Sequence, residues 1–200
     1  MEPKGKANKM SILETDRTYL FSQFTEFNNP PDEILAELGY QLQVESLALP
    51  KSPTIDCSAL KNTLERRIQL TPLTSEQARR ETLVAPILFE VVEPLNLKLN
   101  IEYSLVGKKA KGNLDYLIRG HNSLLVIEAK RDDLTRGFTQ LAVEMIELGD
   151  CYGAVTTGNI WQFAKLRDHQ ITQDLNLYRV PGDLSDLLSI LVGILQPQEL

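Results

Sequence analysis

Two apolar segments separated by a short polar turn constrain this 200-residue chain more than any other feature of its sequence. Residues 113–119 and 123–130 are rich in Leu, Ile and Val, and Gly120, His121 and Asn122 between them are typical of tight turns. The pattern predicts a β-hairpin. Because both strands are apolar on both faces, we expect them to lie inside a sheet that is covered on its two sides.

The centre of the predicted turn, between His121 and Asn122, fixes which residues of the two strands face each other. It places Asp115 directly opposite Glu128, with Cβ atoms about 5 Å apart. Side chains alternate along a strand, so Glu128 and Lys130 point to the same face. The sequence therefore predicts that two carboxylates and one lysine meet in apolar surroundings.

Two opposed carboxylates in an apolar setting repel each other and lose hydration, so something must compensate. A divalent cation held by Asp115 and Glu128 would do so, and Mg²⁺ suits the pair because it takes one or two carboxylates and keeps several waters. Such a cation polarises a phosphoryl oxygen and lowers the pKa of a bound water, while Lys130 stabilises charge on the phosphate. The alternative is an ordinary cross-strand cluster in which Lys130 neutralises one acid.

The hairpin lies within a regular succession of predicted helices and strands. A helix over residues 75–92, with Ser75 as its N-cap, contains Pro86, which should kink it or cost it a hydrogen bond. The other predicted elements are a strand over 98–106, a helix over 133–149, strands over 152–157, 160–166 and 175–180, and a helix over 184–195 capped by Asp183. This order predicts a mixed α/β protein with a central mixed sheet flanked by helices.

Residues 1–70 have a different pattern from the remainder, residues 71–200. They are expected to form an N-terminal extension that packs on the core or makes a homodimer contact. Its predicted elements are a strand over 17–27, a helix over 33–38 capped by Asp32, a strand over 42–49 and a helix over 55–68.

The spacing of the hairpin residues resembles a known family. Asp115, followed after twelve residues by Glu128-Ala129-Lys130, is similar to the signature of the PD-(D/E)XK nucleases, with Leu114 in place of the usual proline. Three further segments strengthen the resemblance. Residues 76–88 are similar to the first helix of the N-terminal nuclease domain of type I restriction-enzyme R subunits and their stand-alone relatives, 138–141 to the family's glutamine motif, and 155–163 to a closing strand–turn–strand.

The resemblance, which spans residues 75–180, implies a restriction-endonuclease-like core. It implies Mg²⁺-dependent phosphodiester hydrolysis of nucleic acid, with DNA favoured and Mn²⁺ as a substitute ion. By the same resemblance Glu76 joins Asp115 and Glu128 at the metal, with Glu81 as the fallback. Gln140 would contact the site or the nucleic-acid backbone.

A net charge of −6 is unfavourable for a protein that binds phosphates. Residues 98–136, however, carry eight basic and five acidic side chains, a local excess of three positive charges. The overall charge favours an alternative, a catalytically inactive nuclease-fold module that acts in nucleic-acid binding or protein assembly. A protein partner that confers specificity is also left open.

Other classes of site are not favoured by the sequence. Cys57 and Cys151 lie far apart without a CxxC pair, which argues against a zinc site, and no P-loop motif is present. The sequence has no long apolar segment and no signal-like N-terminus, so we expect a cytoplasmic protein.

Overall fold

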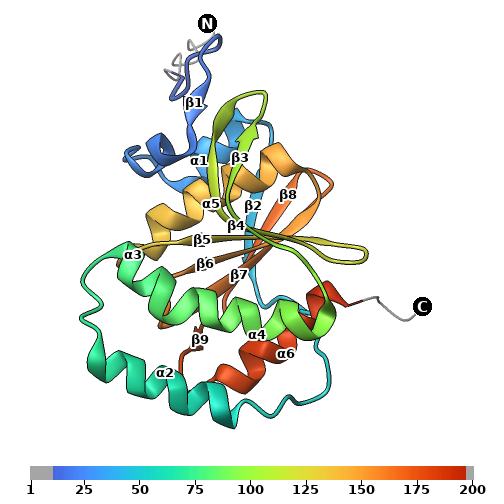
Figure 1. Cartoon of the computed structure of the whole chain (residues 1–200). Coiled ribbons are helices and arrows are strands. Elements are labelled where there is room, and N and C mark those ends of the chain that lie inside the picture. The colour runs from blue at the N-terminus through green and yellow to red at the C-terminus, as the bar shows by residue number, and fades with distance from the viewer. Residues whose placement is uncertain (1–10, 197–200) are drawn as a thin grey trace, which may run out of the picture.

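A mixed sheet forms the centre of the structure, a computed structural model that describes residues 11–196 (Figure 1). Within these residues nine strands run in the order β1-β4-β5-β6-β7-β8-β2, with β3 paired to β4 and β9 to β7. The strands are β1 (Tyr19–Leu20), β2 (Gln41–Glu45), β3 (Leu99–Val106), β4 (Ala110–Arg119), β5 (Leu124–Ala129), β6 (Cys151–Thr156), β7 (Ile160–Arg167), β8 (Gln170–Asp174) and β9 (Tyr178–Arg179). Strands β1 and β4, β5 and β6, and β2 and β8 pair in parallel, and the other pairs are antiparallel.

Helices cover both faces of the sheet (Figure 1). The α-helices are α1 (Pro31–Glu37), α2 (Ser58–Leu70), α3 (Glu76–Arg79), α4 (Ala85–Leu95), α5 (Leu134–Leu148) and α6 (Leu184–Leu195). The 3-10 helix η1 (Phe21–Thr25) precedes α1, and the π-helix η2 (Arg80–Val84) joins α3 to α4. Helices α2, α4 and α6 pack on one face, and η1, α1 and α5 pack on the other. The predicted class, a mixed α/β protein with a central mixed sheet flanked by helices, is confirmed.

The strands of the central hairpin bury side chains on both faces. Ile118 and Ile127 belong to the core under α4 and α6, whereas Leu117 and Val126 belong to the core under α5. Since alternate residues of a strand point to opposite faces, each strand must be apolar throughout to fill both cores. This explains why β4 and β5 lack the polar–apolar alternation of a half-exposed strand.

The predicted helix over residues 75–92 is present as α3, η2 and α4 in succession. Ser75 caps it as predicted, since its hydroxyl accepts a hydrogen bond from the Ala78 N–H at 3.1 Å. The turn that precedes Pro86 is a π-turn, not an α-turn. Proline has no N–H to donate to the preceding turn, so the backbone there is free to adopt the wider spacing.

Three predictions for the N-terminal third and the last strands are wrong. Residues 17–27 form the two-residue strand β1 and the helix η1, because Phe21, Phe24 and Phe27 repeat at a three-residue spacing that suits a 3-10 turn. Helix α1 begins at Pro31, not after Asp32, since proline is preorganised for the first helical position.

The third wrong prediction concerns the strand expected over residues 175–180. The strand is β8, which starts at Gln170 directly after a two-residue turn, and only Tyr178–Arg179 pairs in the predicted segment. Asp168 and His169 make this turn with φ of 48° and 64°. Aspartate and histidine tolerate the left-handed region better than most residues, so they fit this tight turn and β8 begins directly after it.

Residues before position 70 supply strands to both ends of the sheet. Strand β1 pairs with β4, and β2 pairs with β8, while Leu60 and Leu64 of α2 join the core under α4. No helix within residues 11–196 has the length and apolar character needed to cross a membrane.

Candidate active site

The β4–β5 hairpin has the register that the turn predicted. Tyr116 pairs with Ile127, and the ladder continues to Arg119 and Leu124 at the turn. Pairing stops at Tyr116 and Ile127, so Asp115 and Glu128 are the next residues, just where the two strands separate. The end of the ladder therefore presents both carboxylates beside each other without placing them in a regular pair.

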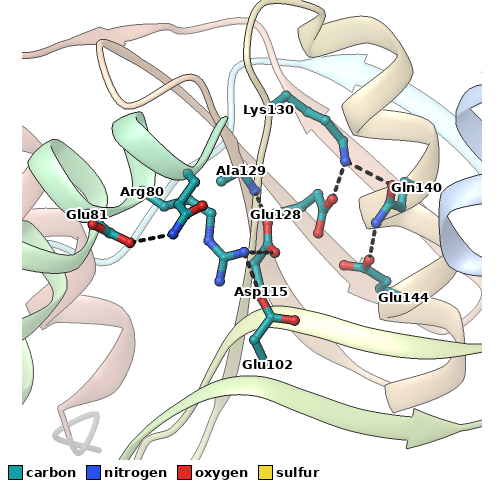
Figure 2. A network of polar contacts seen from close by, with 10 residues as sticks. Arg80, Glu81, Glu102, Asp115, Glu128, Ala129, Lys130, Gln140 and Glu144 are labelled. Atoms are coloured by element: carbon teal, nitrogen blue, oxygen red, sulfur yellow. Dashed lines mark hydrogen bonds and ion pairs between the residues drawn. The ribbon is translucent and has the colours of Figure 1, made fainter. Parts of the chain in front are cut away.

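Three of the predicted residues meet on the side of β5 that faces helix α5. The Lys130 Nζ donates to Glu128 Oε1 at 2.5 Å and to Gln140 Oε1 at 3.0 Å (Figure 2). Glu128 is 1 % exposed and Gln140 is 5 % exposed. Lys130 is thus held between a strand and a helix, with its ammonium group at the edge of the core.

Asp115 lies across the end of β5 instead of beside Lys130. Its Oδ2 accepts a hydrogen bond from the Ala129 N–H at 2.8 Å, and its Oδ1 lies 2.9 Å from Nη1 of Arg80. Figure 2 shows the Asp115 carboxylate between the Arg80 guanidinium and the end of β5. These contacts also fit the ordinary cross-strand alternative, in which Lys130 neutralises one acid, since Lys130 pairs with Glu128.

Arg80 and Glu102 are parts of this site that the sequence did not reveal. The Arg80 Nη1 that binds Asp115 also lies 2.6 Å from Glu102 Oε1, and the guanidinium lies over the Tyr116 ring, 5.2 Å from its centroid. Glu102 faces Asp115 at a break in the β3–β4 ladder and has a φ of 52°. The sequence feature that points to Arg80 is its four-residue spacing from Glu76 on the same predicted helix. Residues at this spacing lie on the same face of a helix.

Glu144 is a further acidic residue that the sequence did not reveal. It is fully buried, and its Oε1 accepts a hydrogen bond from Gln140 Nε2 at 2.9 Å (Figure 2). The sequence feature that points to Glu144 is its four-residue spacing from Gln140 on an amphipathic helix. This spacing puts both side chains on the side of the helix that faces the core. Among the described residues, one oxygen each of Glu128 and Glu144 is buried without a donor. A proton shared between the two carboxyls would satisfy both.

The acidic side chains of this site bind protons more tightly than usual. Burial raises the pKa of Asp115 to about 6, against the opposing effects of Arg80 and the Ala129 N–H. Burial, with the charges of Glu144 and Asp115, raises the pKa of Glu128 well above its ordinary value. Burial also raises the pKa of Glu144 to about 8. Without a cation, Glu144 therefore holds a proton at neutral pH.

Lys130 stays charged in this environment. Burial acts to lower the pKa of its ammonium group, but the charge and hydrogen bond of Glu128 outweigh burial, and the pKa is raised overall. A charged Lys130 can donate only, so it fixes Gln140 with Oε1 toward the lysine and Nε2 toward Glu144.

Glu76 and Glu81 differ in their relation to the site. Glu76 is half-buried in the first turn of α3, and its charge acts on both Asp115 and Lys130. Glu81 is exposed and accepts a hydrogen bond from the Gln77 amide at 2.9 Å, away from Asp115 (Figure 2). Of the two, Glu76 is the better placed to reach the site.

A cleft of about 580 Å³ opens beside Lys130. Of the predicted site residues, Glu76 and Lys130 line it, and its walls carry both basic and acidic side chains. Its lining residues are Thr25, Thr74, Ser75, Glu76, Lys130, Arg131, Asp132, Asp133 and Arg136.

The donor set fits a cation that needs few protein ligands. The buried Oε2 of Glu128 has no donor, and Asp115 lies at the same end of the hairpin. In residues 11–196 no three His, Cys, Asp or Glu side chains form a ready-made metal site. Two carboxylates match Mg²⁺, which keeps several of its waters.

Comparisons with protein-family models, with curated proteins and with solved structures found no match for this chain. The resemblance to the PD-(D/E)XK nucleases therefore rests on the residues themselves and is a hypothesis about the family.

Helix α5 approaches Lys130 closely because residue 137 is a glycine. A Cβ atom at Gly137 would lie 2.6 Å from Lys130 Cγ and 2.9 Å from Val155 Cγ2. Gly137→Ala is expected to lower the melting temperature, corresponding to a loss of about 1 kcal/mol or more from overpacking. An exposed helical glycine would instead gain stability from this change. Thermal unfolding of the two proteins checks the sign, and a higher melting temperature would contradict the close packing at Lys130.

Proposed function

We propose that this chain is a Mg²⁺-dependent nuclease that hydrolyses phosphodiester bonds, with DNA as the favoured substrate. The observation that carries the proposal is the position of Lys130. Its ammonium group is bound to Glu128 and Gln140, and Lys130 lines a cleft beside the end of the hairpin. Buried carboxylates can hold a divalent cation for metal-assisted hydrolysis, and a charged lysine beside them can stabilise charge on a phosphate.

The roles of the residues follow from their contacts. Asp115 and Glu128 would hold the cation, and Glu76 would act on its waters from across the cleft. The bound cation would supply polarisation of a phosphoryl oxygen and a water of lowered pKa. Lys130 would stabilise the charge that develops on the phosphate, and Gln140 would keep Lys130 in place. Gln140 therefore acts through Lys130, since both ends of its amide are already hydrogen-bonded.

The cleft offers positive charge to a phosphate backbone. Arg131 and Arg136 line it together with Lys130, and both arginines are exposed and paired with the neighbouring Asp132 and Asp133. Such exposed pairs are weak, so a phosphate can replace the carboxylate at little cost. We therefore place the nucleic acid over this cleft.

A second candidate is an inactive module that binds nucleic acid or assembles with another protein. The contacts of Asp115 favour it, because Arg80 and the Ala129 N–H already neutralise this carboxylate without a cation. The net charge of −6 also favours the inactive module, because a negative protein repels the phosphates of a nucleic-acid substrate.

Calorimetric titration of Mg²⁺ and Mn²⁺ into the protein tests the proposal first. The wild type is expected to bind either ion saturably, and Asp115→Asn is expected to lose this binding because one anionic ligand is removed while the side-chain shape is kept. Asp168→Asn, an equally conservative change on the exposed β7–β8 turn, serves as the control and should bind like the wild type. If the wild type binds neither ion with or without a DNA duplex present, the inactive module becomes the better description.

A further inference from the structure

The Arg80 guanidinium lies against the Asp115 carboxylate, a group that the proposed function assigns to the cation. One nitrogen, Nη1, lies 2.9 Å from Asp115 Oδ1 and 2.6 Å from Glu102 Oε1, so it bridges the two carboxylates (Figure 2). The other oxygen of Asp115 is taken by the Ala129 N–H. Oδ1 is therefore the oxygen that Asp115 can offer to a metal, and Arg80 holds it.

The backbone around Arg80 is shaped for this contact. Arg80 is the first residue of the π-helix η2, and π-turns are common at functional sites. Glu102, on the opposite side, has a left-handed φ of 52° at a break in the β3–β4 ladder. A non-glycine residue in this region costs free energy that the surrounding structure must offset. Both local irregularities lie at one ion-pair network.

Glu102 and Asp115 differ in burial. The Asp115 side chain is 11 % exposed and that of Glu102 is 49 % exposed. A cation interacts most strongly with the buried carboxylate of Asp115, because solvent screens that pair least. The exposed Glu102 can pair with the Arg80 guanidinium at little cost in desolvation.

We propose that Arg80 competes with the cation for Asp115, and that Glu102 holds Arg80 away from Asp115 when the cation is bound. This inference rests on the proposed metal-dependent function. In the metal-free protein Arg80 neutralises Asp115. With the cation in place, Arg80 keeps its contact with Glu102, and its remaining N–H groups become available for a phosphate oxygen beside the metal. Arg80 is thus a positioning residue that prevents an uncompensated charge at Asp115.

Calorimetric titration of Mg²⁺ at about pH 8.5 tests the inference, a pH at which an Asp115 carboxyl of raised pKa is ionised. Arg80→Gln is expected to bind Mg²⁺ tighter than the wild type, by about tenfold or more, because the competing charge is gone. Unchanged or weaker binding in Arg80→Gln would overturn the inference while leaving the metal site of the proposed function intact. Failure of both proteins to bind, with and without a DNA duplex present, would overturn both proposals.

A second variant keeps the test independent of the folding of Arg80→Gln. Glu102→Gln is expected to weaken Mg²⁺ binding, because Arg80 then has Asp115 as its one carboxylate partner. In the double variant Arg80→Gln/Glu102→Gln the effect of Glu102→Gln should largely disappear. If Glu102→Gln weakens binding equally in both backgrounds, Glu102 acts by its own charge and the proposed exchange is wrong. Glu81→Gln is the control for loss of a nearby negative charge, because Glu81 lies next to Arg80 in η2 but accepts its hydrogen bond from Gln77.

Discussion

Lys130→Met is expected to reduce phosphodiester hydrolysis by about 10²- to 10³-fold, the usual effect of removing one donor that stabilises charge in a transition state. Methionine keeps the apolar stem against Gly137 and removes the ammonium group that binds Glu128 and Gln140. The fold should survive, because the buried Glu128 carboxyl can take up a proton when its partner is lost. Cleavage of a fluorescently labelled DNA duplex in Mg²⁺ measures the effect.

The control for this variant is Lys165→Met. Lys165 is a half-buried lysine on β7 whose ammonium group lies over the Tyr152 ring, and it belongs to the same sheet. Its loss removes a positive charge and a ring contact at a distance from the cleft, so cleavage should stay near that of the wild type. If Lys130→Met retains cleavage close to the wild-type rate, Lys130 is a structural residue and the proposed role is wrong.

Glu144→Gln is expected to stabilise the metal-free protein at alkaline pH. Burial raises the pKa of Glu144 to about 8, far above that of an unfolded glutamate. A raised pKa contributes stability that is present below the unfolded pKa and is lost as pH rises through the folded pKa. The free energy of unfolding of the wild type in EDTA should therefore fall between about pH 5 and pH 9.

Glutamine removes this titration and keeps the contacts. Its carbonyl oxygen can accept from Gln140 Nε2, and its amide can donate to the buried oxygen of Glu128. At about pH 8.5 the variant should exceed the wild type by a few kcal/mol, and at about pH 5 the two should be nearly equal. Thermal and urea unfolding of both proteins across this pH range measure the difference in their free energies of unfolding. Glu90→Gln on the exposed side of α4 is the control, and equal slopes for wild type and Glu144→Gln would show that Glu144 does not hold the proton.

The parts of the site that the sequence predicted are those set by local pattern. The turn at residues 120–122 fixes the hairpin register, and the alternation along β5 puts Glu128 and Lys130 on one face, whereas Gln140 was expected at the site from the family resemblance alone. The first two of these inferences each span few residues and depend on one geometric period.

The parts that the sequence did not predict depend on pairing between distant segments. Glu102 reaches Asp115 through the β3–β4 ladder and its local break, which no single-strand pattern reveals. Arg80 contacts Asp115 from the first residue of the π-helix η2, a local geometry that the helical repeat of the sequence does not indicate. Glu144 stands on the buried side of an amphipathic helix where an apolar residue is expected, so its burial follows from the packing of α5 on β5. The strand β8 was missed for a related reason, since its tight turn uses Asp168 and His169 with positive φ.

The pairing of β2 with β8 has a consequence for the way this protein acquires its structure. Gln41–Glu45 pairs in parallel with Gln170–Asp174, so one end of the sheet is assembled from segments that lie far apart in the chain. Ordering such a long loop is entropically costly, and contacts of this kind slow folding. The β3–β4–β5 meander joins neighbouring segments and can form early, whereas β2 has no strand partner until β8 has been synthesised. During translation β2 therefore remains without its strand partner until all but the last of the strands described in residues 11–196 have been made.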